Sequence, residues 1–147
     1  DASPDEVFAV VSDPWRIPEY VSLVLEILEV SDGPLGVGTK ITEKAKPGPF
    51  KVTTHWEIVE YEPPHRHVWR GHQVDMEMTL TKSVTREGSG TRYEQWIDYR
   101  YMPRFRPLGW LLEKLVVDRT VKKSFEGVVS GIKKTVESER QSSMGAS

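Results

Sequence analysis

The chain has 147 residues, a formal net charge of −2 and no cysteine. This length is typical of one domain with a sizeable core, and the near-neutral charge argues against a general nucleic-acid-binding surface. The lack of cysteine excludes disulfides and thiol nucleophiles and fits a reducing, cytoplasmic setting. No apolar run reaches the roughly 18 residues that a membrane-spanning helix needs, so no transmembrane segment is expected.

The N-terminal residues have the pattern of a helix start. Ser3 can cap the helix, and Glu6 stands three residues later, where it can complete a capping box. The sequence therefore predicts a first helix that ends near residues 12–14. A second short helical turn is expected over residues 15–20.

From residue 24 onward the apolar period changes towards two, which is typical of strands. The predicted strands cover residues 24–31, 39–45, 50–61, 66–71, 74–86 and 91–101. Their connections have hairpin length, which favours an antiparallel sheet. The glycines within 33–38 precede a strand and not a helix, so they do not indicate a phosphate-binding loop.

The last two predicted strands alternate clearly between two faces. The faces expected to point inward carry Val74, Met76, Met78, Leu80 and Val84 on one strand and Tyr93, Gln95, Ile97, Tyr99 and Tyr101 on the other. The opposite faces hold mostly charged and polar residues, which would be costly to bury.

Residues 108–139 carry the long helical pattern of the chain, with an apolar stripe on a charged rod. The apolar positions fall into two sets that differ in direction by about 100°. The sequence therefore predicts a short helix over 108–117, a bend, and a long helix over about 119–138. Residues 140–147 are expected to be a disordered tail or a non-native extension.

Two short helices, about six strands and one long helix indicate an α+β domain. The chain resembles the START-like superfamily, in particular its polyketide cyclase/dehydrase and coenzyme-Q-binding branch. The motifs that carry the resemblance are Ala2 to Phe8 leading to Asp13-Pro14, Gly36-Val37-Gly38-Thr39, Glu57-Ile58 running to Pro63-Pro64, and Gly90-Thr91. The resemblance covers residues 2–139 and implies one helix-grip domain over 1–139. In that fold a curved antiparallel sheet of six to seven strands wraps around a long C-terminal helix, with a cavity between them.

In one respect the sequence departs from the family pattern. Family members normally begin with a strand that lies beside the last strand, but here the first helix starts almost at residue 1. Without that strand, residues 91–101 would form an exposed sheet edge, which favours pairing with another chain. A monomer or weak dimer is expected, and a chain extended at its N-terminus is expected to be more stable.

The predicted ligand-binding residues combine thioether, tyrosine and tryptophan side chains. They are Trp56, Trp69, Met76, Met78, Tyr93, Gln95, Ile97, Tyr99, Tyr101, Leu112, Leu115 and Phe125. A mostly apolar lining with a few polar groups suits a small hydrophobic ligand. The alternative is a filled core, which is the simpler interpretation for Met76, Met78 and Ile97.

The sequence thus predicts a protein that binds a small hydrophobic or aromatic ligand, such as a lipid, an isoprenoid quinone or a polyketide, without a cofactor or metal. One alternative is a polyketide cyclase or dehydratase that uses Tyr99 and Arg119 in catalysis. A second is a protein-interaction module, to which Trp96 on the charged outer face points. His65, His67 and His72 are expected at the surface or the cavity mouth.

Overall fold

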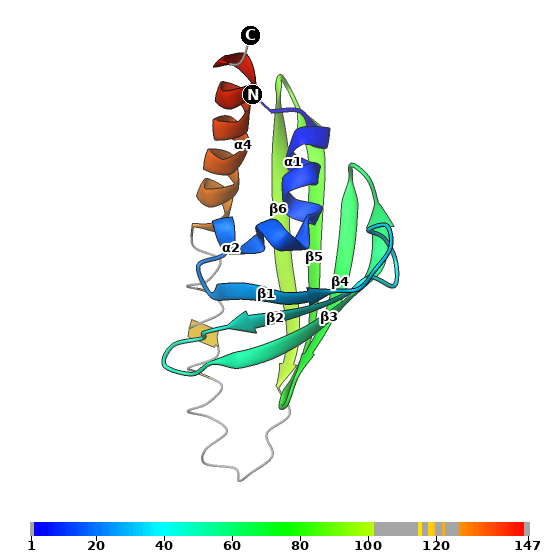
Figure 1. Cartoon of the computed structure of the whole chain (residues 1–147), viewed down its shortest axis with the longest axis vertical. Coiled ribbons are helices and arrows are strands. Elements are labelled where there is room, and N and C mark those ends of the chain that lie inside the picture. The colour runs from blue at the N-terminus through cyan, green and yellow to red at the C-terminus, as the bar shows by residue number, and fades with distance from the viewer. Residues whose placement is uncertain (1, 102–114, 116–117, 120–121, 123–126, 146–147) are drawn as a thin grey trace.

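The computed structural model describes residues 2–101, 115, 118–119, 122 and 127–145. The six strands form one antiparallel sheet in the order β1-β2-β3-β4-β5-β6, so each strand pairs with its neighbour in sequence. The elements are α1 (Pro4–Ser12), the 3₁₀ helix η1 (Pro14–Arg16), α2 (Ile17–Tyr20), β1 (Val24–Val30), β2 (Lys40–Ala45), β3 (Val52–Glu62), β4 (Arg66–Gln73), β5 (Met76–Glu87), β6 (Gly90–Tyr101) and α4 (Val128–Gly145). Figure 1 shows α1 and α2 against the curved sheet, with α4 beside them.

The first helix begins with the predicted capping box. The backbone N–H of Glu6 donates to Ser3 Oγ at 3.3 Å, and the N–H of Ser3 donates to Glu6 Oε2 at 2.7 Å. These bonds satisfy backbone donors that a helix start leaves free. The helix ends at Ser12, where Asp13 accepts from the N–H of Trp15 and starts the 3₁₀ turn. The predicted bounds of this region are confirmed.

The predicted alternation of the last two strands is also confirmed. Opposite partners across β5 and β6 include Met78 with Tyr99 and Leu80 with Ile97. Residues directly opposite in an antiparallel pair share a face, and here that face packs against the core. Val74 was expected on the same face, but this prediction is wrong. It lies in the turn before β5 and is 78% exposed.

The C-terminal helix α4 packs closely against the N-terminal helices. Val128, Ile132 and Val136 are buried and join the common core. Gly131 meets Tyr20 of α2, where an added Cβ would lie 3.0 Å from the Cβ of Tyr20 and 3.1 Å from its Cα. The absence of a side chain at Gly131 therefore permits the close approach of the two helices.

The boundaries of the C-terminal helix differ from the prediction. The sequence favours one helix over about 119–138, but the structure has a turn at Gly127, whose φ is +99°. The carbonyl of Gly127 accepts from Gly131 N at 2.8 Å and from Ser130 Oγ at 2.9 Å, so α4 begins at Val128. Most of the predicted helix over 108–117 and the bend after it lie outside the described residues.

A disordered tail or a non-native extension is expected from residue 140, and α4 continues into this segment as far as Gly145. Arg140 forms an ion pair with Glu6 at 3.4 Å, which ties this end of the helix to α1. Arg16 pairs with Glu139 at 2.6 Å in the same region. In the described part of the chain, no helix has the length and apolar character needed to cross a membrane.

Candidate ligand-binding site

Most of the predicted lining residues that the structure describes share the core-facing side of the sheet. Trp56, Trp69 and Met78 are buried, while Met76, Tyr93, Ile97 and Tyr99 are partly buried against the core. Gln95 is half-buried, and Tyr101 pairs with Met76 where β6 ends. Leu115, by contrast, is 58% exposed, and Leu112 and Phe125 lie outside the described residues.

Two tryptophans form an aromatic wall on β3 and β4. The rings of Trp56 and Trp69 meet edge to face, with centroids 6.3 Å apart and an interplanar angle of 66°. Trp56 lies directly over Gly71, where an added Cβ would be 2.4 Å from Cε3 of the indole. Only glycine at this position leaves room for the ring, so Gly71 fixes the place of Trp56 against β4.

The tyrosine hydroxyls on β6 are satisfied within the protein. Tyr93 donates to Oε1 of Gln95, and Tyr99 donates to Oδ1 of Asp118. Burial raises the pKa of Tyr93, and the hydrogen bond to Asp118 is the main reason why the pKa of Tyr99 rises to about 12. Both phenols therefore stay protonated at neutral pH, which argues against Tyr99 as a general base.

The second catalytic candidate, Arg119, is exposed. It directly follows Asp118, which accepts the hydrogen bond from Tyr99, but its exposure means that the two predicted catalytic residues do not form a buried site.

A group of buried polar and aromatic side chains lies on the same face, beneath α1 and α2. This interior polar cluster consists of Tyr20, Glu43, Trp56, His67, Trp69 and Lys82. Lys82 and Glu43 were missed as site residues in the sequence because charged side chains were assigned to the outer face. The alternation of β5 could have identified Lys82, because the even-numbered residues of this strand, including Met78 and Val84, point inward.

Lys82 is 2% exposed and makes its contacts with backbone and aromatic groups. Its Nζ donates to the carbonyl of Val11 at 2.9 Å, in the last turn of α1, where helix carbonyls lack intrahelical partners. The same Nζ lies 4.5 Å from the ring centroid of Trp69 and 5.9 Å from that of Tyr20. Burial lowers the pKa of Lys82 to about 7, and the charge of Glu43 partly opposes this shift.

Glu43 is the second buried charged group of the cluster. Burial raises the pKa of this carboxyl, while the indole of Trp56 and the charge of Lys82 lower it by smaller amounts. Glu43 and Lys82 influence each other through space but do not form a contacting ion pair. Burial therefore favours the neutral form of both groups.

His67 corrects an expectation from the sequence, which placed it at the surface or the cavity mouth. It is completely buried, with its ring 5.3 Å from that of Phe8. Its Nδ1 accepts from Nε1 of Trp69 at 2.9 Å, so in the neutral ring the proton is on Nε2. Desolvation, followed by the charge of Lys82, lowers the pKa of His67 to about 2.

The three histidines near the β3–β4 turn do not form one group. His72 alternates to the face opposite His67 on β4, where it stacks on His55 at 5.3 Å. His65 is exposed before the strand begins. Within the described residues, no set of three His, Cys, Asp or Glu side chains is arranged to hold a metal ion.

Nε2 of His67 is a buried donor that has no hydrogen-bond partner among the described residues. Nε1 of Trp56 makes no hydrogen bond of normal geometry, although the indole lies near enough to the Glu43 carboxyl to lower its pKa. Leaving a buried donor unpaired costs about 1–3 kcal/mol, so native proteins usually satisfy such groups with protein, water or ligand. The cluster therefore offers N–H donors to an oxygen acceptor.

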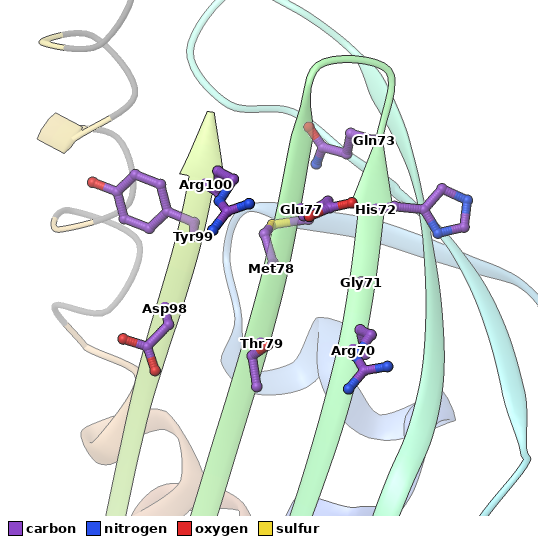
Figure 2. A pocket seen from close by; sticks show the side chains of 10 residues that line it. All are labelled: Arg70, Gly71, His72, Gln73, Glu77, Met78, Thr79, Asp98, Tyr99 and Arg100. Atoms are coloured by element: carbon purple, nitrogen blue, oxygen red, sulfur yellow. The ribbon is translucent and has the colours of Figure 1, made fainter. Parts of the chain in front are cut away.

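A separate hollow of about 870 Å³ lies over β4, β5 and β6. Figure 2 shows two transverse rows of side chains there, Arg70–Thr79–Asp98 and His72–Glu77–Arg100, and the strand register confirms these rows. The remaining lining residues are Gly71, Gln73, Met78 and Tyr99. Trp56 fills the inner side at Gly71, so this hollow lies on the charged outer face and is not the apolar cavity that the family resemblance implies.

The whole architecture is shared with solved structures. TTHA0849 from Thermus thermophilus superposes with a TM-score of 0.75 at 23% identity, covering 94% of this chain and 92% of that one. Ara h 8.0201 gives a TM-score of 0.66 at 16% identity, covering 93% and 91%. Ms6760 from Mycobacterium smegmatis gives 0.64 at 20% identity, covering 94% and 86%. The fold is thus an α+β helix-grip fold.

The sequence itself matches the profile of one family in this class over residues 1–137. The chain belongs to the family described as polyketide cyclase / dehydrase and lipid transport. A comparison with curated proteins gives no match. Family membership confirms the resemblance stated above and supports a hydrophobic-ligand-binding function, without specifying a ligand.

Proposed function

We propose that this protein binds a small hydrophobic or aromatic ligand, such as a lipid, an isoprenoid quinone or a polyketide, between the sheet and the C-terminal helix. The observation that carries this proposal is an apolar surface that the described residues cover only in part. Met76, Leu80, Ile97 and Tyr99 lie on the core-facing side, yet each remains only partly buried. An apolar ligand would cover the surface that these side chains leave open.

The chemistry of the surrounding side chains supports the same conclusion. Methionine adapts to irregular and varied shapes, and Met78 lies directly opposite the partly buried Tyr99 of β6, with Met76 two residues before it on the same strand face. The edge-to-face pair of Trp56 and Trp69 adds an aromatic wall that suits planar groups. These features favour a ligand with an aromatic or unsaturated body.

The proposal is tested by titrating the purified protein with 1-dodecanol and 2-acetylnaphthalene while following tryptophan fluorescence. Ile97→Asn places a polar group on the inner face, and Trp96→Asn makes a matched change at the next position on the outer face. We expect about tenfold weaker binding for Ile97→Asn and unchanged binding for Trp96→Asn. Failure of both probes to bind the unaltered protein would refute the proposal.

A cyclase or dehydratase activity is a second proposal, and Lys82 and Glu43 support it better than Tyr99 and Arg119. A buried amine whose pKa lies near 7 is suited to general-base catalysis at neutral pH. Loss of turnover in Lys82→Met with retained ligand binding would support this activity. Trp96 is 44% exposed on the outer face, but one side chain is too small a patch to favour the interaction-module alternative.

A further inference from the structure

We infer that the ligand carries an acidic oxygen, as a carboxylate or phenolate on an apolar body, and that the ammonium group of Lys82 binds this oxygen. The inference rests on the proposed function, because it describes the polar end of the same ligand. It is carried by the contacts of Lys82 and by the unpaired donor of His67.

The first step concerns the hydrogen bonds of Lys82. A lysine ammonium has three N–H donors. One of them bonds to the carbonyl of Val11, and in the described chain no other acceptor contacts Nζ. The remaining neighbours are the rings of Trp69 and Tyr20, which attract a cation but do not replace two hydrogen bonds. Lys82 therefore has donors available for an oxygen of the ligand.

The second step concerns charge. Burying an unpaired ammonium is costly, and a contacting anion is the usual way to offset that cost. Glu43 does not contact Lys82, and burial shifts this carboxyl towards its neutral form. An acidic oxygen at Nζ would supply the missing counter-charge, and a protonated Glu43 would not repel it.

The third step is independent of Lys82. Nε2 of His67 is a buried donor without a partner, and His67 lies directly opposite Lys82 across β4 and β5. His67 and Lys82 both contact Trp69, through a hydrogen bond and a ring face respectively. His67 and Lys82, which both have N–H donors without an acceptor, thus lie against the indole of Trp69. This location identifies the polar end of the site.

A purely structural role for Lys82 does not explain its remaining N–H donors. Capping the carbonyl of Val11 uses one N–H, and the hydroxyl of Tyr20 already donates to the same oxygen at 3.5 Å. A side chain with a single donor would satisfy this carbonyl. The other donors of Lys82 are better explained by an acceptor that the ligand brings, and an anionic acceptor would also stabilise the protonated amine.

The test compares dodecanoate with 1-dodecanol by isothermal titration calorimetry, since the two probes share an apolar body and differ in the acidic group. We expect the unaltered protein to bind dodecanoate about tenfold more tightly than the alcohol, because hydrogen bonds between ionised groups are the stronger ones. In Lys82→Met this preference for dodecanoate over 1-dodecanol should vanish. Lys82→Arg should keep part of the preference.

Lys51→Met is the matched control, because it removes one positive charge from an exposed position and should leave the preference intact. Equal affinities for the two probes in the unaltered protein would overturn the inference, as would a preference that survives in Lys82→Met. Either result would leave the proposed function standing. Binding of neither probe would instead refute the proposed function, and the inference with it. The comparison in the unaltered protein decides the matter even if Lys82→Met does not fold.

Discussion

The indole N–H of Trp69 donates a 2.9 Å hydrogen bond to Nδ1 of His67, and both side chains are fully buried. This bond assigns the remaining ring proton of His67 to Nε2. It also orients the face of Trp69 on which Lys82 lies. The electrostatics of the interior polar cluster therefore depend on a neutral histidine.

The neutral state of His67 predicts a loss of stability in acid. The pKa of His67 is about 2 in the folded protein and near its usual value of 6.5 when unfolded. Below pH 6.5 the unfolded chain binds a proton that the folded chain does not, so stability falls as the pH falls from 6.5 towards 2. We compare the free energy of unfolding at pH 7 and at pH 4.5. On this change of pH the unaltered protein should lose about 2 kcal/mol more of it than His67→Gln does.

Urea unfolding at the two pH values measures this difference. His72→Gln is the control, because His72 is exposed on the outer face of the same strand. The free energy of unfolding of His72→Gln should depend on pH in the same way as that of the unaltered protein. Identical curves for the unaltered protein and His67→Gln would contradict the prediction.

Lys82 predicts a pH dependence of the same sign in alkaline solution. Its pKa is about 7 when folded and 10.5 in the reference state, so between these values the unfolded chain binds more protons. Stability should therefore rise with pH above 7. From pH 7 to pH 9 the gain attributable to Lys82 is on the order of 2 kcal/mol, and it should be absent in Lys82→Met. Guanidinium unfolding at both pH values checks this, with Lys51→Met as the control that keeps the gain.

Gly71→Ala should displace the indole of Trp56. The new Cβ would lie 2.4–2.8 Å from three ring atoms, which is far closer than carbon atoms pack. We expect a loss of about 2 kcal/mol in the free energy of unfolding, together with altered tryptophan fluorescence and weaker binding of 2-acetylnaphthalene. Gly36→Ala is the control, since nothing lies within 4 Å of the added Cβ there. Equal stability of the two variants would show that Trp56 moves aside at no cost.

Gly131→Ala should separate α4 from α2. Alanine favours a helix over glycine by about 1 kcal/mol, but the new Cβ would press on the backbone of Tyr20. We expect the steric cost to exceed this gain, with a net loss of about 1 kcal/mol in stability. Gly145→Ala lies on the same helix in open space and should be neutral or slightly stabilising. A melting temperature of Gly131→Ala above that of the unaltered protein would disprove the steric argument.

The sequence predicts the sheet well because its alternation is a local property. Once the hairpin between β5 and β6 is located, the residues opposite Met78 and Leu80 are found by counting the same number of positions away from the turn on each strand. The turn at Gly127 was missed because a glycine within a helical pattern is compatible with a continuous helix and only its positive φ reveals the break.

The interior polar cluster could not be predicted in the same way. Its groups are stabilised by partners far apart in the sequence, such as the carbonyl of Val11 for Lys82. His67 had a usable local signal, because it stands two residues before Trp69 and so shares its face on β4. The prolines just before it pointed instead to a surface loop, and only the sheet register resolves the conflict.

The contact between Gly131 and Tyr20 connects the C-terminal helix with the buried amine. The backbone and Cβ of Tyr20 lie against α4, its ring lies beside Nζ of Lys82, and its hydroxyl shares the Val11 carbonyl with that amine. The packing of α4 and the surroundings of the buried amine are thus joined by one residue, Tyr20.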